Sequence, residues 1–126
     1  MKFLLVDDSK TMRNIQKKIL EQMGTIEFSE AEDGVEALSV LEKTPGGFDL
    51  ILVDWNMPNM DGITLVGKIR EHDKKTPLVM ATTEAEKVRV IEAIRAGVNN
   101  YVVKPFTPEL LLEKVRATMD RMKAAA

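Results

Sequence analysis

The sequence contains no cysteine, so disulfide bonds and thiol chemistry are excluded. No uninterrupted apolar run approaches the roughly 20 residues that a membrane-spanning helix needs. The formal net charge is −2, which argues against a general binder of nucleic acid or membrane surfaces. Strand-like residues begin directly after Met1 and leave no room for a secretory signal, so we expect a cytoplasmic protein.

The chain has the size and composition of one globular domain. Of its 126 residues, 44% are hydrophobic and 30% are charged, proportions that are ordinary for a domain with a single core. It contains no linker, internal repeat or low-complexity segment. We therefore expect one domain over residues 1–126, in which the closing run Ala124 to Ala126 is a frayed helix end or an added tail.

Short apolar runs of strand length alternate with longer segments of helical periodicity. The expected strands cover residues 2–6, 25–30, 48–53, 77–81 and 100–103. We expect five helices: residues 10–23, residues 33–43 with Asp33 as the cap, a third carrying Ile63, Val66 and Ile69, a fourth opened by a capping box at Thr83–Glu86 and closed by Gly97, and a fifth starting at Thr107 and Pro108.

Apolar stripes predict which faces of the first and last helices are buried. These stripes are Met12, Ile15, Ile19 and Met23 in the first helix, and Leu111, Val115, Met119 and Met122 in the last. The strands themselves are nearly continuous apolar runs, which is typical of a parallel sheet covered by helices on both faces. The sequence therefore predicts an α/β fold.

Polar side chains follow four of the five expected strands. They are Asp7 and Asp8 after the first strand, Asp54 after the third, Thr82 and Thr83 after the fourth, and Lys104 before Pro105 after the fifth. Ligands of open parallel sheets bind beyond the carboxyl ends of the strands. One edge of the sheet is thus expected to hold three carboxylates, hydroxyl groups and an ammonium group.

A lone aspartate after a strand is most often a turn residue or a helix cap, and Asp8 or Ser9 can cap the first helix. Two adjacent aspartates, however, repel each other without improving a cap, and Asp54 begins no obvious helix. Oxygen ligands suit Mg²⁺ or Ca²⁺, and a site with few protein ligands suits Mg²⁺. The one histidine, His72, lies at a polar helix end, where we expect a solvated surface position.

Five short motifs occur in order along the chain: Val6-Asp7-Asp8-Ser9, the block from Asp54 to Gly62, Thr82, Tyr101, and Lys104-Pro105-Phe106. Together they resemble the receiver domains of bacterial two-component systems, in particular the stand-alone receivers of chemotaxis. The resemblance implies a flavodoxin-like, doubly wound sheet of five parallel strands in the order 2-1-3-4-5 with five helices.

The resemblance also implies a role for each site residue. Asp54 is the implied phosphoacceptor. Asp8, Asp54 and the backbone carbonyl of Asn56 are implied ligands of Mg²⁺, and Asp7 is expected to act mainly through a metal-bound water. The phosphoryl group would meet Lys104 and Thr82, Tyr101 would be the aromatic switch, Asn56 and Glu84 would tune autodephosphorylation, and the Lys104–Pro105 peptide bond would be cis.

The implied protein is a phosphorylation-activated switch rather than a conventional enzyme, although it catalyses its own phosphotransfer and autodephosphorylation. Its expected partners are a chemotaxis-type histidine kinase, an effector such as the flagellar motor switch, and a phosphatase; a monomer is expected. The implied output surface lies on the fourth helix, fifth strand and fifth helix and offers Lys87, Arg89, Arg95, Tyr101, Lys114 and Arg116. Ordinary surface solvation is the alternative interpretation of those basic residues.

Other functions remain open at this point. A stand-alone receiver can serve a phosphorelay or a pathway other than motility. A Mg²⁺-dependent phosphatase using Asp54 would need a second acid two residues later, where Asn56 stands. A flavin-binding electron carrier can share the same sheet, but three acids at the expected phosphate position would repel its cofactor.

Overall fold

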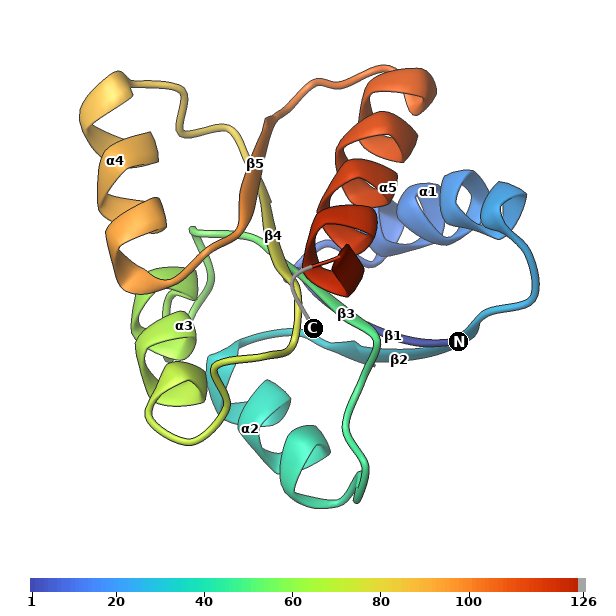
Figure 1. Ribbon diagram of the computed structural model, residues 1–126. Coiled ribbons are helices and arrows are strands. Elements are labelled where there is room, and N and C mark those ends of the chain that lie inside the picture. The colour runs from blue at the N-terminus through green and yellow to red at the C-terminus, as the bar shows by residue number, and fades with distance from the viewer. Residues whose placement is uncertain (125–126) are drawn as a thin grey trace.

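Five parallel strands form one sheet in the order β2-β1-β3-β4-β5 (Figure 1). In this computed structural model, which describes residues 1–124, the strands are β1 (Lys2–Val6), β2 (Glu27–Ala31), β3 (Leu50–Val53), β4 (Leu78–Thr82) and β5 (Asn100–Val103). The predicted α/β class and strand order are confirmed. Of the run Ala124 to Ala126, only Ala124, the last residue of the final helix, lies within the described range.

The helices cover both faces of the sheet, with α1 and α5 on one side and α2, α3 and α4 on the other (Figure 1). They are α1 (Lys10–Leu20), continued by the 3₁₀ turn η1 (Glu21–Met23), α2 (Gly34–Glu42), α3 (Gly62–Arg70), α4 (Lys87–Ala96) and α5 (Pro108–Ala124). None of the helices in this described part of the chain is long and apolar enough to cross a bilayer.

Side-chain caps fix where four of the helices begin, since each satisfies a free amide at a helix start. At α5 the predicted cap Thr107 is present, and its Oγ1 accepts from the Leu110 amide at 3.1 Å. Ser9 Oγ accepts from the Met12 amide at 3.1 Å. Asp33 and Asp61 accept in the same way from the third residue after them. The predicted capping box at Thr83–Glu86 is wrong: α4 begins at Lys87 and has no side-chain cap. Glu84, which that box placed in the helix, instead accepts a hydrogen bond from Asn56.

The predicted apolar stripe of α1 is also partly wrong. Arg13 and Gln16 are buried beside Ile19, whereas Ile15 is 44% exposed. The cause is polar: the Arg13 guanidinium donates to the backbone carbonyl of Asp7 and forms a 2.8 Å ion pair with Glu30. These bonds turn the helix so that an arginine, rather than an isoleucine, faces the sheet.

The buried face of α5 differs more mildly from its prediction. Leu111 and Val115 are buried as expected, together with Leu112 and Thr118, while Met119 is half-buried. The Thr118 hydroxyl donates to a backbone carbonyl one turn earlier and accepts from Asn100, so its burial leaves no polar group unpaired.

Candidate functional site

Three aspartates meet at the carboxyl edge of the sheet. Asp7 follows β1 and Asp54 follows β3, and these strands are neighbours in which Val6 is paired with Val53. The Asp54 amide donates to the Val6 carbonyl at 2.9 Å, which locks the two strand ends together. Carboxylate oxygens of Asp7, Asp8 and Asp54 lie within 4.8 Å of one another. Asp7 and Asp54 are buried and Asp8 is exposed, so the cluster opens to solvent on the side of Asp8.

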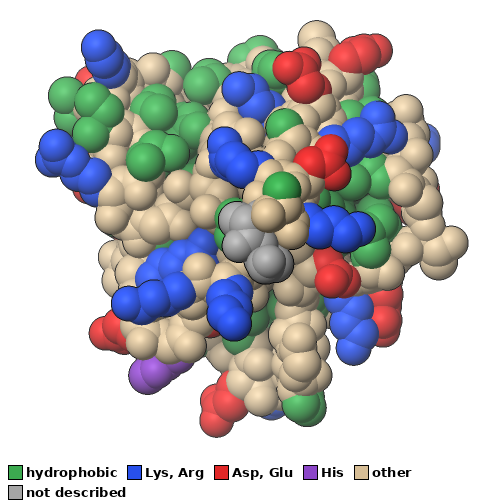
Figure 2. Space-filling model, in the orientation of Figure 1, with side chains coloured by type: hydrophobic (Ala, Val, Ile, Leu, Met, Phe, Trp, Pro, Cys, Tyr) green, Lys and Arg blue, Asp and Glu red, His purple; other side chains and the backbone are tan. Residues whose placement is uncertain are grey.

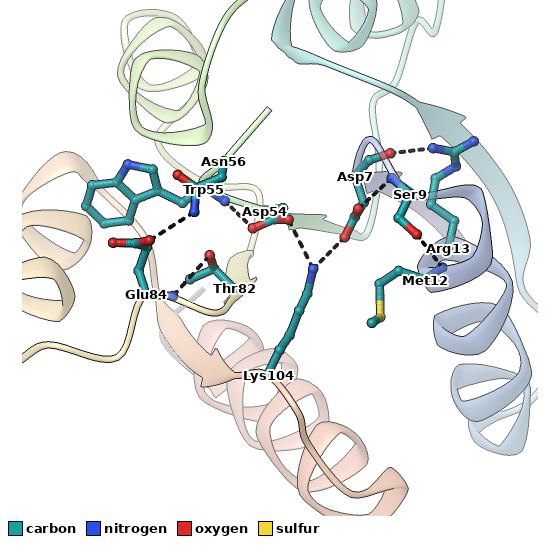
Figure 3. Close-up of polar contacts among 10 residues, drawn as sticks. All are labelled: Asp7, Ser9, Met12, Arg13, Asp54, Trp55, Asn56, Thr82, Glu84 and Lys104. Carbon is teal, nitrogen blue, oxygen red and sulfur yellow. Dashed lines mark hydrogen bonds and ion pairs between the residues drawn. The ribbon is translucent and has the colours of Figure 1, made fainter. Parts of the chain in front are cut away.

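Lys104 supplies the positive charge that faces this cluster. It follows β5, and its amide donates to the Thr82 carbonyl at 2.8 Å, which aims its side chain across the end of β4. Its Nζ lies 2.7 Å from Asp7 Oδ2 and 3.0 Å from Asp54 Oδ2 (Figure 3). The predicted cis bond between Lys104 and Pro105 is present.

Burial and the ion pairs act in opposite directions on the pKa values of Lys104 and Asp7. Burial lowers the pKa of Lys104, but its bonds to Asp7 and Asp54 outweigh burial and leave that pKa above its ordinary value. Burial raises the pKa of Asp7, and the hydrogen bond from Lys104 opposes the rise only in part. The lysine is therefore charged at neutral pH, while Asp7 is held in surroundings that disfavour its negative charge.

The Asp54 carboxylate has a fixed orientation. Its Oδ1 accepts from the amide of Trp55 at 2.7 Å, and its Oδ2 accepts from Lys104. Gly62 approaches the same backbone closely and donates to the Trp55 carbonyl at 2.8 Å. A Cβ at position 62 would overlap the Asp54 carbonyl and lie 2.9 Å from Trp55 Cα, so only glycine fits there.

The loop between β4 and α4 closes the other side of the site. Thr82 is fully buried, and its hydroxyl oxygen accepts from the Glu84 amide at 3.4 Å. Glu84 Oε2 accepts from Asn56 Nδ2 at 3.0 Å. The hydroxyl of Tyr101 donates to the Glu84 backbone carbonyl at 2.5 Å, so this ring reaches toward the loop. Burial, with the nearby charges of Glu84 and Asp54, raises the pKa of Tyr101 to about 12.

Two contacts of this site could not be found from the sequence. The Ser9 amide donates to Asp7 Oδ1 at 2.8 Å, so the α1 cap also orients an acid of the cluster. Arg89, predicted only as a surface residue, has its guanidinium over the Trp55 ring, with Cζ 5.4 Å from the ring centroid. A helical spacing of three and four residues does link Arg13, Gln16 and Leu20, and was the one available signal that Arg13 is buried.

The donor set fits a hard divalent cation. Three carboxylates face one small volume, their oxygens are the ligands that Mg²⁺ prefers, and Lys104 alone does not neutralise them. Neither histidine nor cysteine takes part: the sequence has no cysteine, and His72 is exposed at the end of α3 as predicted.

Comparison with known proteins gives one family over most of the chain. The family model described as "Response regulator receiver domain" matches residues 3–116. The "Chemotaxis protein CheY homolog" of Campylobacter jejuni is 50% identical over 117 residues, which cover 91% of this chain and 89% of that protein. The "Chemotaxis protein CheY" of Pseudomonas aeruginosa is 47% identical over 124 residues, covering 97% of this chain and 98% of that one.

Solved structures share the fold along nearly the whole chain. A CheY-like receiver domain protein of Methanospirillum hungatei has a TM-score of 0.89 at 30% identity and covers 99% of this chain and 98% of its own. The chemotaxis response regulator CheY4 of Vibrio cholerae has a TM-score of 0.84 at 38% identity, with 93% and 97% covered.

Proposed function

The chain belongs to the response regulator receiver family, and we propose that it is a single receiver domain that takes a phosphoryl group on Asp54 from a histidine kinase and then binds an effector. Family membership and the chemotaxis relatives support phosphorylation-activated signalling in chemotaxis as the general role. The observation that carries the specific proposal is the meeting of Asp7, Asp8 and Asp54 with Lys104 at one sheet edge.

Each of these residues has a task in phosphoryl transfer. An oxygen of Asp54 attacks phosphorus while the bond from phosphorus to the histidine nitrogen of the kinase breaks, which gives an acyl phosphate. Asp7, Asp8, Asp54 and the carbonyl of Asn56 would hold Mg²⁺, which neutralises charge on the phosphoryl oxygens. Lys104 already lies 3.0 Å from Asp54, within reach of a phosphoryl oxygen attached there.

Thr82 and Tyr101 link the site to the molecular surface. The phosphoryl group adds roughly −1.5 to −2 charge and three acceptor oxygens. The Thr82 hydroxyl donates to one of those oxygens, which biases the loop that Glu84 and Tyr101 share toward one of its arrangements. Tyr101 is the aromatic member of that switch.

The effector surface centres on α4. The helix exposes Val88, Ile91 and Ile94, an apolar patch flanked by basic side chains (Figure 2). The basic residues of α4 that flank this patch are Lys87, Arg89 and Arg95, and all three are exposed. Lys114 of α5 is half-buried. Arg116 instead lines a groove with Met23 and Pro77, the residue before β4. Arg116 is therefore not part of the effector surface.

The proposed effector is a protein of the flagellar motor switch, and a phosphatase is a further partner. A phosphorelay or a pathway other than motility is the alternative within the family. Asn56 counts against a conventional phosphatase, because an amide cannot serve as the second acid. The domain is proposed to act as a monomer and not to bind nucleic acid.

Phosphotransfer from a chemotaxis histidine kinase carrying labelled phosphate tests the proposal. The wild type should take up label in Mg²⁺, and Asp54→Asn should take up none. Asp61→Asn is the matched control, since Asp61 caps α3 outside the cluster and asparagine caps as well as aspartate. Label on Asp54→Asn at the wild-type rate would contradict the assignment. Capture of the labelled protein by a motor-switch peptide, rather than transfer to a second histidine protein, separates the chemotaxis role from the phosphorelay.

A further inference from the structure

Arg89, in the first turn of α4, joins three segments of the chain at one guanidinium group. Its Cζ lies 5.4 Å from the centroid of the Trp55 ring. Its Nε lies 3.7 Å from Glu84 Oε1 in the preceding loop, and its Nη1 lies 3.3 Å from Glu92 Oε1 one turn further along the helix. The guanidinium thus bridges the end of β3, the β4–α4 loop and α4.

A single exposed ion pair does little to fix the position of its side chains, because solvent screens the charges and the side chains stay mobile. Arg89 differs in having a planar group with one face on an indole and two edges directed at carboxylates, an arrangement that leaves few rotamers. Glu92 holds one edge from within the same helix. The remaining edge is therefore presented to Glu84 in one orientation.

Glu84 is held from both sides. Its Oε1 faces Arg89 and its Oε2 accepts from Asn56 Nδ2 at 3.0 Å. That hydrogen bond fixes the Asn56 amide, because the NH₂ end is turned to Glu84 and the Oδ1 end is left as an acceptor. Asn56 stands two residues after Asp54, and the Asn56–Glu84 pair lies beside the Asp54 carboxylate (Figure 3).

We propose that Arg89 is a positioning residue that, through Glu84, orients the Asn56 amide and thereby sets how fast the phosphoryl group is lost from Asp54. This rests on the proposed phosphorylation of Asp54. A water molecule donates a hydrogen bond to Asn56 Oδ1 and attacks phosphorus in line. The new bond joins the water oxygen to phosphorus, the bond from phosphorus to the Asp54 oxygen breaks, and inorganic phosphate leaves with the released proton passing to solvent.

The test measures the loss of labelled phosphate from the whole protein in Mg²⁺ after the kinase is removed. Arg89→Gln should lengthen the phosphoryl lifetime about three- to tenfold, the size expected for coupling between neighbouring charged groups. Lys68→Gln is the matched control, since it removes one positive charge from the exposed face of the adjacent helix α3. It should leave the lifetime unchanged.

A double-mutant cycle separates positioning from a general structural effect. Once Glu84→Gln has removed the charge that Arg89 faces, adding Arg89→Gln should cause no further slowing. Trp55 emission gives a second readout without metal or phosphate: Arg89→Gln should change it in EDTA, because the cation leaves the indole face.

Three results would overturn the proposal. The lifetime of Arg89→Gln could equal that of the wild type, the effects of Arg89→Gln and Glu84→Gln could simply add, or Lys68→Gln could slow the loss as much as Arg89→Gln. In each case the wild type still takes up label and the proposed phosphoacceptor stands. A wild type that takes up no label on Asp54 overturns both proposals.

Discussion

The ammonium group of Lys104 forms an ion pair with Asp54 at 3.0 Å, inside a site where the lysine side chain is only 10% exposed. The same ammonium also contacts Asp7 at 2.7 Å. The lysine is therefore the counter-ion of two buried carboxylates before any cation or phosphoryl group arrives. This arrangement has consequences for stability as well as for phosphorylation.

Removing that counter-ion should destabilise the metal-free protein. Lys104→Met leaves Asp7 and Asp54 buried without their shared cation, and breaking a buried pair in this way costs about 3 kcal/mol. Urea unfolding in EDTA measures the loss. Mg²⁺ should restore part of it, and Lys43→Met, at the exposed end of α2, should have little effect. Equal stability of Lys104→Met and the wild type in EDTA would mean that the pair contributes nothing.

Asp8 should behave in the opposite way. It is the exposed member of the cluster and adds negative charge beside Asp7 and Asp54. Asp8→Ala should raise the melting temperature in EDTA, because it relieves repulsion. It should also remove the stabilisation that Mg²⁺ gives the wild type. Thermal melts with EDTA and with Mg²⁺ check both effects. A melting temperature in EDTA that falls or does not change would show that the acids do not repel one another measurably.

Trp55 is the only tryptophan and provides an internal reporter. Its indole is 7% exposed and packs in the core, while its amide is bonded to Asp54. Mg²⁺ should alter the Trp55 emission saturably. Its affinity should be about sub-millimolar to millimolar, as is common for Mg²⁺ sites with few protein ligands. Acetyl phosphate should then cause a further change that requires Mg²⁺ and is absent in Asp54→Asn. If calorimetry shows that Mg²⁺ binds while the Trp55 emission does not change, the cation binds elsewhere.

Tyr101 is the only tyrosine, so its ionisation can be followed directly by absorbance at high pH. Folding raises its pKa from 10.0 to about 12, first through burial and then through the charges of Glu84 and Asp54. The native state therefore holds the phenolic proton more tightly than the unfolded chain does. The stability gained in this way is complete below the unfolded value of 10.0 and is lost as pH rises toward about 12. A titration midpoint near 10 in the native protein would contradict the partly buried, hydrogen-bonded hydroxyl.

Most of the site follows from sequence because its residues stand directly after strands. Once the strand order is given, Asp7 and Asp54 must be neighbours, and Lys104 must reach them across β4. No local rule, by contrast, predicts Arg89 over Trp55, since the contact joins a helix to a residue 34 positions earlier (89 − 55). Such contacts depend on how whole elements are placed, which periodicity does not specify.

Two of the wrong predictions have related causes. Thr83–Glu86 has the letters of a capping box, but hydrogen bonds to Glu84 from Asn56 and Tyr101 hold that loop outside the helix. In α1 the apolar periodicity points to Ile15, but the bonds of Arg13 to Asp7 and Glu30 outweigh the burial of one isoleucine. In both places a tertiary polar contact overrides a local preference.

The bond between Lys104 and Asp7 joins residues that are 97 positions apart. During synthesis Asp7, which follows β1, therefore emerges long before the lysine that pairs with it, and Asp54, which follows β3, also precedes β5. A nascent or truncated chain that ends before β5 has the acids without their counter-ion and without the strand that completes the sheet. The charge-balanced cluster of Asp7, Asp54 and Lys104 is therefore complete only once the final quarter of the polypeptide has been made.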